Sequence, residues 1–193
     1  MTLKPKRQKR CKACLETFYP RATTQKACSI NCAQKLVKAD QQRALKADSR
    51  KRRQAIKGHR EWLREAQAAF NRFVRVRDYG RPCISSGREM DWEGKGITTG
   101  SRVDAGHYRS TGAASHLRFN LWNCHAQSVR DNRDLSGNAV DYRIGLIERI
   151  GLERVEALEG DNEPRRFDID YLKRVKSIFT RRARLYERLR QID

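Results

Sequence analysis

The sequence lacks a long hydrophobic run. No apolar stretch among its 193 residues approaches the roughly 18 residues that a membrane-spanning helix needs. Residues 1–10 are basic and lack the apolar region of a signal peptide. We therefore expect neither a membrane protein nor a secreted one, and we place the chain in a reducing cytoplasm.

Acidic residues are scarce relative to basic ones. The chain has 23 Asp and Glu against 43 Lys and Arg, which gives a net charge of +20 and a pI of about 10.3. Such an excess indicates a polyanionic partner, with nucleic acid as the first candidate. Charge does not distinguish DNA from RNA. No motif that reads base edges is present, so we expect salt-sensitive binding that depends on the shape and backbone of the nucleic acid.

The length allows one ordinary domain and a small accessory module. No internal repeat or long low-complexity segment interrupts the chain. The pattern predicts an α+β protein in three segments: a basic tail with a cysteine module in 1–35, a basic linker helix that turns amphipathic in 36–78, and a mixed unit with C-terminal helices in 79–193.

Four of the six cysteines follow the spacing Cys-x2-Cys-x13-Cys-x3-Cys, at Cys11, Cys14, Cys28 and Cys32. Two short-spaced pairs about a dozen residues apart are typical of a tetrahedral zinc site, because each pair lies on a tight turn. Four thiolates leave no open position for water. We therefore predict one structural zinc, with Phe18, Tyr19 and Pro20 packed over it.

The segment from Ala33 to Asp78 is predicted to be helical, with a break at Gly58. It carries a net charge of +9, and its first part lacks an apolar stripe. A helix of that kind bridges modules or lies on a partner, although a merely solvated face is the simpler alternative. The second part has apolar residues at helical spacing, which predict a face that packs on the following segment. They are Trp62, Ala66, Phe70, Phe73 and Val74.

Three further helices are expected near the C-terminus, of which the middle one is a short helix through Val155 to Leu158 that stops at Gly160. Ser136 is a candidate N-cap for a helix that ends at Gly151, with an apolar face of Val140, Ile144, Ile147 and Ile150. A long helix starts near Asp168. Residues 173–190 of this helix carry a net charge of +7, which suits a second contact with a nucleic-acid backbone.

Residues 104–138 gather three of the four histidines with several Asp and Asn residues. A short predicted strand bearing His107 is followed by a loop, Asn123 and a segment with polar side chains. This is the order of a ββα-metal nuclease, in which a histidine activates water and a divalent cation serves the leaving oxygen. The spacing alone is moderately specific, because an Asp-x2-His pair in a strand is more often a surface feature.

Several short motifs lie between residues 82 and 151. They are Pro82-Cys-Ile-Ser, Asp104-Ala-Gly-His-Tyr-Arg, Leu117-Arg-Phe-Asn, Asn123-x-His125, Asn132, Ser136-Gly-Asn, Tyr142-Arg and Ile147-x-Arg-Ile-Gly151. Together they resemble one known family, the NinG family (Rap recombination proteins) of lambdoid phages. The resemblance covers nearly the whole chain, including the four-cysteine module.

The resemblance implies a phage recombination protein with an HNH-like nuclease unit in 79–193. Members of this kind would be structure-selective endonucleases that cleave branched DNA, such as a Holliday junction or D-loop, by metal-assisted phosphodiester hydrolysis. His107 would be the general base and Asn123 would support it. Asp104 and Asn132 would hold Mg or Mn. The location would be the cytoplasm of the bacterial host.

Four arginines near this candidate site are predicted to bind the DNA backbone, since a guanidinium matches the geometry of a phosphate. They are Arg109, Arg118, Arg130 and Arg133. Ordinary salt bridging is the alternative for at least half of them. A symmetric junction also suggests a homodimer, by analogy.

The chain departs from the family pattern at a second zinc knuckle. Only Cys83 remains there, with Ser86, Ser128 and Asp131 at the other three positions, so this knuckle is predicted to be metal-free. Either packing through Trp122, Phe119 and the flanking helices replaces the zinc, or the nuclease centre is loosened. A non-catalytic DNA-binding protein is therefore the alternative function. The roles of His125 and Asp134 stay open.

Overall fold

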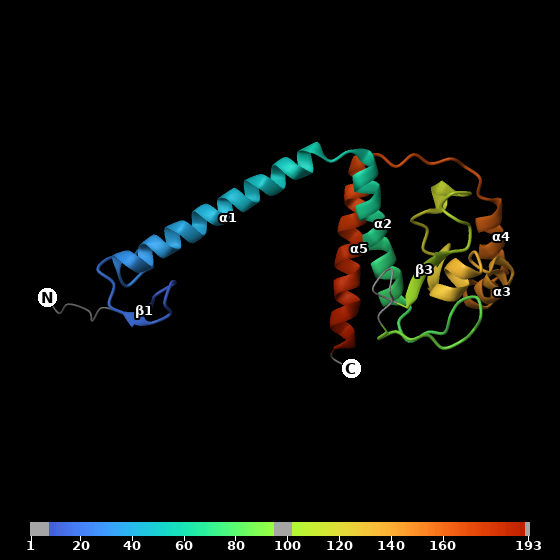
Figure 1. Ribbon diagram of the computed structural model, residues 1–193, viewed down its shortest axis with the longest axis horizontal. Helices are drawn as coiled ribbons and strands as arrows, with labels where there is room; N and C mark the ends of the chain where they lie inside the picture. The colour runs from blue at the N-terminus through green and yellow to red at the C-terminus, as the bar shows by residue number, and fades with distance from the viewer. Residues whose placement is uncertain (1–7, 95–101, 192–193) are drawn as a thin grey trace. The chain divides into compact units, whose positions relative to one another are not determined.

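The computed structural model describes residues 8–94 and 102–191, and most of the expected basic tail lies outside them. The protein combines long helices with two small antiparallel sheets (Figure 1). It divides into two compact units, 1–57 and 58–193. The helix break at Gly58, and not the end of the amphipathic helix at Asp78, separates them. Within the described residues, no helix is both long enough and apolar enough to cross a membrane.

The first unit is a small hairpin followed by a long helix. Strand β1 (Lys9–Arg10) pairs with β2 (Thr17–Phe18), and helix α1 covers Ile30–Ile56. Cys32 is the one buried residue of α1, so the prediction of a polar helix is confirmed. Phe18 packs on the cysteines as predicted, whereas Tyr19 is 64% exposed and does not.

The second unit is built on two long helices. Helix α2 (His59–Arg77) lies beside α5 (Ile169–Arg190), as Figure 1 shows. Phe70 and Phe179 meet edge to face with ring centroids 4.9 Å apart, a favoured geometry for aromatic pairs. The five predicted apolar residues of α2 are all buried, which confirms the predicted face.

Strands β3 (Val103–His107) and β4 (Cys124–Ser128) form an antiparallel pair in the second unit. Their register sets His107 opposite Cys124 and Asp104 opposite Gln127. Cys124 lies in the core with α2 and α5. A five-residue π-helix, η2 (Arg130–Asp134), follows β4 directly.

Helices α3 (Ala139–Ile150) and α4 (Leu152–Gly160) follow, and Gly151 ends α3 as predicted. The predicted N-cap was wrong, because Asn138 and not Ser136 is the capping residue.

The predicted apolar face of α3 was also wrong in part. Tyr142 and Leu146 are fully buried, whereas Val140 and Ile144 are exposed. The reason lies in tertiary contacts. The Tyr142 hydroxyl donates to the Gly106 carbonyl at 2.9 Å and accepts from the His125 amide at 3.1 Å, which turns this side of α3 toward the strands.

Candidate metal site and nucleic-acid interface

The structure brings the four N-terminal cysteines together. Their sulfur atoms all lie within 4.8 Å of one another, and Cys28 Sγ is 3.6 Å from the sulfurs of both Cys14 and Cys32. A tetrahedral zinc with Zn–S bonds of about 2.3 Å would place its sulfurs about 3.8 Å apart. The geometry therefore fits one metal ion such as zinc.

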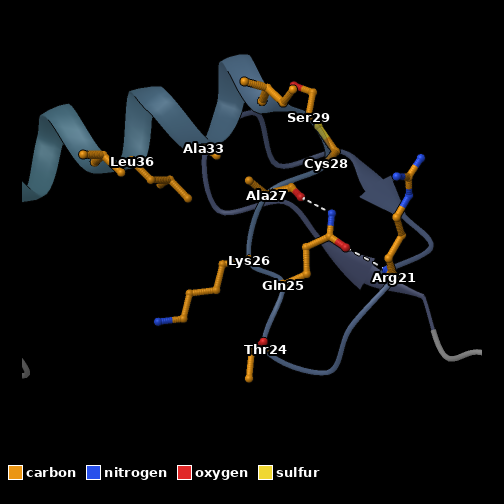
Figure 2. A pocket seen from close by; sticks show the side chains of 11 residues that line it. Arg21, Thr24, Gln25, Lys26, Ala27, Cys28, Ser29, Ala33 and Leu36 are labelled. Atoms are coloured by element: carbon orange, nitrogen blue, oxygen red, sulfur yellow. Dashed lines mark hydrogen bonds between the residues drawn. The ribbon is translucent and has the colours of Figure 1, made fainter.

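Local structure explains why these sulfurs converge. The hairpin turn carries Cys11 and Cys14, and Leu15, at φ 65°, closes it because its amide donates a hydrogen bond to the Cys11 carbonyl. Gln25 bridges the Arg21 amide and the Ala27 carbonyl, which fixes the chain before the third cysteine (Figure 2).

The second cysteine pair lies at the start of α1. Ser29 caps the helix by accepting from the Cys32 amide at 3.2 Å, and this turn holds Cys28 and Cys32 on one side.

The electrostatics of this cluster also favour a cation. The amides of Cys14, Ala13 and Cys28 outweigh burial and lower the pKa of Cys11 to about 6. The Glu16 amide favours the thiolate of Cys14, but neighbouring sulfurs and burial raise the pKa of Cys14 to about 12. Four thiolates this close repel one another strongly, so only a bound cation allows all of them to ionise.

His107, the predicted general base, lies at the end of β3. Its Nε2 is 3.0 Å from the Arg118 carbonyl oxygen. Since a carbonyl only accepts, Nε2 carries the proton and Nδ1 is the accepting nitrogen, 3.8 Å from Cys124 Sγ. The ring also stacks on Phe70. Burial lowers the pKa of His107, so the imidazole is neutral near pH 7.

Asn123 is fully buried and holds the chain just beyond His107. Its Oδ1 accepts from the Arg109 amide at 2.8 Å, and its Nδ2 donates to the Arg109 carbonyl at 2.9 Å. The side chain therefore fixes the path of the backbone after the histidine. Asn123 is therefore a positioning residue for His107.

The two predicted cation ligands, Asp104 and Asn132, are neighbours. Asn132 Nδ2 donates to Asp104 Oδ2 at 3.0 Å. However, Arg133 donates to both carboxylate oxygens of Asp104, at 2.7 and 2.9 Å. A guanidinium in that position leaves the carboxylate neutralised, so a divalent cation does not fit the arrangement seen here.

Strand geometry separates Asp104 from His107. Successive side chains of a strand point to opposite faces, so residues three apart do not share a face. Asp104 contacts the η2 helix, whereas His107 contacts Phe70 and Cys124. Among residues 8–94 and 102–191, the group of three or more His, Cys, Asp or Glu side chains close enough to hold a metal is the four-cysteine cluster.

The four positions of the second knuckle do meet, around a carboxylate. Asp131 Oδ2 accepts from Ser128 Oγ at 2.6 Å, Ser86 Oγ at 2.8 Å and Cys83 Sγ at 3.2 Å. Asn138 Nδ2 donates to the other oxygen at 3.2 Å. We call these five residues the Asp131 cluster. Hydrogen bonds thus join the segments at these four positions.

Of the two aromatic residues expected to replace the second zinc knuckle by packing, only one lies in the core. Phe119 is buried in the core as expected, but Trp122 is 47% exposed, with Arg154 over its ring at 5.2 Å. The sequence suggested packing or loosening as the two outcomes, and it gave no sign of a carboxylate that gathers three donors.

His125 occupies a buried structural position. Its Nε2 is 3.2 Å from the Trp122 carbonyl, which only accepts, so Nδ1 accepts from Arg77 at 3.1 Å. Burial lowers the pKa of His125 despite the nearby carboxylate of Asp78. Asp134, the other residue with an open role, is exposed at the end of η2.

Asp78 is a buried residue that sequence reasoning missed. Arg77 donates to both of its oxygens at 2.7 Å, and the Ala126 amide of β4 donates to Oδ2 at 2.9 Å. Burial raises the Asp78 pKa, but the interactions of the carboxylate with His125 and Arg77 outweigh it, so the pKa is lowered. An Asp after a basic helix gives no sequence signal of such burial.

The four predicted DNA-binding arginines have different surroundings. Arg109 donates to the carbonyls of Leu158 and Asp161 and therefore anchors the end of α4. Arg133 is paired with Asp104. Arg130 is exposed on η2, and Arg118 is half-buried beside His107.

The fold and the cysteine cluster define a strongly basic protein with a four-cysteine module that could hold a metal ion and a strand pair packed by helices. The sequence profile described as "Bacteriophage Lambda NinG protein" matches residues 3–189, so the chain belongs to the NinG family.

Two similar relatives illustrate how far the similarity extends. The chain is 37% identical to Protein ninG of Escherichia phage lambda over 95% of both chains. It is 36% identical to Protein ninG of Salmonella phage P22, covering 92% of this chain and 93% of that one. No solved structure matches the chain.

Proposed function

We propose that this protein is a phage recombination endonuclease that cleaves branched DNA, such as a Holliday junction or D-loop, in the cytoplasm of the bacterial host. The proposal depends on one observation: the imidazole of His107 lies at the end of β3, directly before a backbone segment that buried Asn123 fixes by two hydrogen bonds. Burial lowers the pKa of this imidazole. A neutral histidine is the form that accepts a proton from attacking water.

The reaction would be hydrolysis of a phosphodiester bond. The accepting nitrogen of His107, Nδ1, faces the Cys124 thiol in this conformation, so the imidazole must turn or the thiol must move before water is deprotonated. Because Arg133 holds Asp104, we derive no step through a divalent cation. Zinc in the cysteine module would be structural.

The DNA would be held chiefly through its backbone. Helix α1 carries eight Lys and Arg against two Asp, and its side chains are mostly exposed. The Lys and Arg side chains of α5 are also mostly exposed. Such surfaces bind phosphates without reading bases, and a symmetric junction would suit a homodimer.

The test is a cleavage assay on branched DNA with Mg²⁺ and Mn²⁺ present, at salt low enough for binding. His107→Gln keeps a donor for the Arg118 carbonyl but removes the basic nitrogen, and it should abolish cleavage while retaining junction binding. Cys124→Ala, which frees Nδ1 without removing the imidazole, is the matched control and should cleave. Wild-type protein that binds but never cuts would refute the proposal.

A non-catalytic DNA-binding factor is the second candidate. It is favoured by the occupied state of the centre, in which both His107 nitrogens and both Asp104 oxygens have partners. Loss of cleavage in His107→Gln with unchanged junction binding would exclude this candidate, because a protein without a centre has no such activity to lose.

A further inference from the structure

We propose that a pocket between the start of α2, the η1 turn (Ser115–Leu117) and the segment before α5 binds an unpaired nucleotide, with cations for its phosphate and a phenyl ring for its base. We call it the Arg118 pocket. The residues on which the proposal depends are Arg118, Arg165, Arg166 and Phe167, and Ser115 and Leu63 are among the other residues that line the pocket.

Arg118 provides the main electrostatic argument. Its guanidinium is half-buried, and it donates to the neutral side-chain oxygen of Gln67 at 3.3 Å. Within the part of the chain that the structure describes, no carboxylate forms an ion pair with it. Burial lowers the pKa of Arg118, which reflects the cost of a charge removed from water without a counter-ion. A bound anion would supply that counter-ion.

The neighbouring arginines differ in a way that leaves positive charge in the pocket. Arg165 is neutralised by Asp161 at 2.7 Å. Arg166 is exposed and, across 8–94 and 102–191, has no carboxylate partner. Asp168 lines the pocket too, but its carboxylate accepts from the Tyr171 amide as the N-cap of α5. Two guanidinium groups therefore remain for a phosphate.

Phe167 provides a fixed aromatic wall. Its ring stacks on Tyr171, with centroids 4.9 Å apart and an interplanar angle of 15°, and it meets Phe119 edge-on at 5.2 Å. His59 contacts the Phe167 carbonyl at 2.6 Å, which ties α2 to this segment. A rigid ring beside arginines is the composition of a site where a base stacks and its phosphate is bound.

The chemistry favours an unpaired nucleotide over a duplex. In a duplex both faces of a base are covered by stacking, so only base edges and the backbone are available to a protein. A base in a flap or at a branch point has a free π-face. The pocket also adjoins the candidate centre, since the carbonyl of Arg118 accepts from His107 Nε2.

Binding to this pocket deepens the proposed function but can be measured without cleavage. The experiment measures binding of the full-length protein, in EDTA, by the fluorescence anisotropy of three labelled DNAs. The first is a duplex that carries a single-stranded flap, the second is the same duplex with an abasic flap, and the third is a blunt duplex. Arg118→Gln, Arg166→Gln and Phe167→Leu are tested. Arg154→Gln, outside the pocket at Trp122, is the matched control.

We expect each arginine variant to weaken flap binding about 10-fold, as loss of about 1.4 kcal/mol implies, with little effect on the blunt duplex. Phe167→Leu should weaken the flap with bases but not the abasic flap. Equal losses on flap and blunt duplex, or an abasic flap bound as tightly as the normal one, would overturn the proposal. Failure of cleavage alone would leave it standing, and thermal unfolding checks that each variant is folded.

Discussion

Ser128 donates to Asp131 through a hydrogen bond of 2.6 Å, the shortest of the three that converge on Asp131 Oδ2. The Ser128 hydroxyl also accepts from the Asp131 amide at 3.0 Å, so the two residues are joined twice. This pair links the end of β4 to η2, and Cys83 and Ser86 add the turn before β3. A carboxylate thereby holds together segments with little core of their own.

The Asp131 cluster should contribute measurably to stability. Asp131→Asn keeps the shape but removes the charge and presents an amide donor to hydroxyl donors. We expect it to lower the free energy of unfolding by about 1–3 kcal/mol, the cost of leaving buried polar groups unsatisfied. Urea unfolding would measure the change. Asp134→Asn, on the exposed end of the same short helix, is the control, and an equal effect of both would contradict this role.

The same carboxylate should make the protein sensitive to acid. Burial raises the pKa of Asp131, but the hydrogen bonds from Ser128, Ser86 and Cys83 outweigh it, so the pKa is lowered in the folded state. Its stabilising contribution is therefore present above the unfolded pKa of about 3.9 and is lost as pH falls through the folded value. Between pH 5 and pH 3, the free energy of unfolding should fall more steeply with decreasing pH in the wild type than in Asp131→Asn.

His107 and His125 predict a second pH dependence of the protein's stability. Burial lowers the pKa of His107 and of His125 in the folded state. The unfolded chain then binds more protons, so stability is complete above the unfolded value of about 6.5 and declines as pH falls below it. His107→Gln should reduce the slope of unfolding free energy between pH 7.5 and 5.5. An unchanged slope would mean that His107 does not titrate abnormally.

The cysteine site predicts a metal content. Elemental analysis should find about one zinc per chain, since the second knuckle has a single thiol. A chelator should unfold the hairpin of the first unit while leaving α2 and α5 intact, as hydrogen exchange would show. Cys11→Ser should lose the zinc, whereas Cys124→Ser should keep it. Two zinc ions per chain would show that the Asp131 cluster binds metal after all.

Much of the architecture follows from local patterns. The structure confirms four predictions from the sequence. They are the convergence of the four cysteines, the helix break at Gly58, the apolar face of α2 and the helix end at Gly151. Each depends on residues close in sequence, where turn geometry or a 3.6-residue period constrains the outcome.

The buried face of α3 could not be predicted in the same way. In the sequence, the exposed Ile144 looks as suited to a core as the buried Tyr142. The hydrogen bond from the Tyr142 hydroxyl to the Gly106 carbonyl decided which side of α3 is buried. A Cβ at Gly145 would lie 1.9 Å from the Ile84 carbonyl oxygen, so the glycine allows α3 to approach the segment that contains Ile84. Both contacts join distant segments.

The sequence thus determined the four-cysteine module, the long basic helices and the family, because these depend on spacing and composition along the chain. The tertiary structure decided the state of the central residues. It set Arg133 on Asp104, Cys124 against His107, and three donors around Asp131. These partners are up to 48 residues apart, and hydrogen bonds and ion pairs between such positions leave no periodic trace in a single sequence.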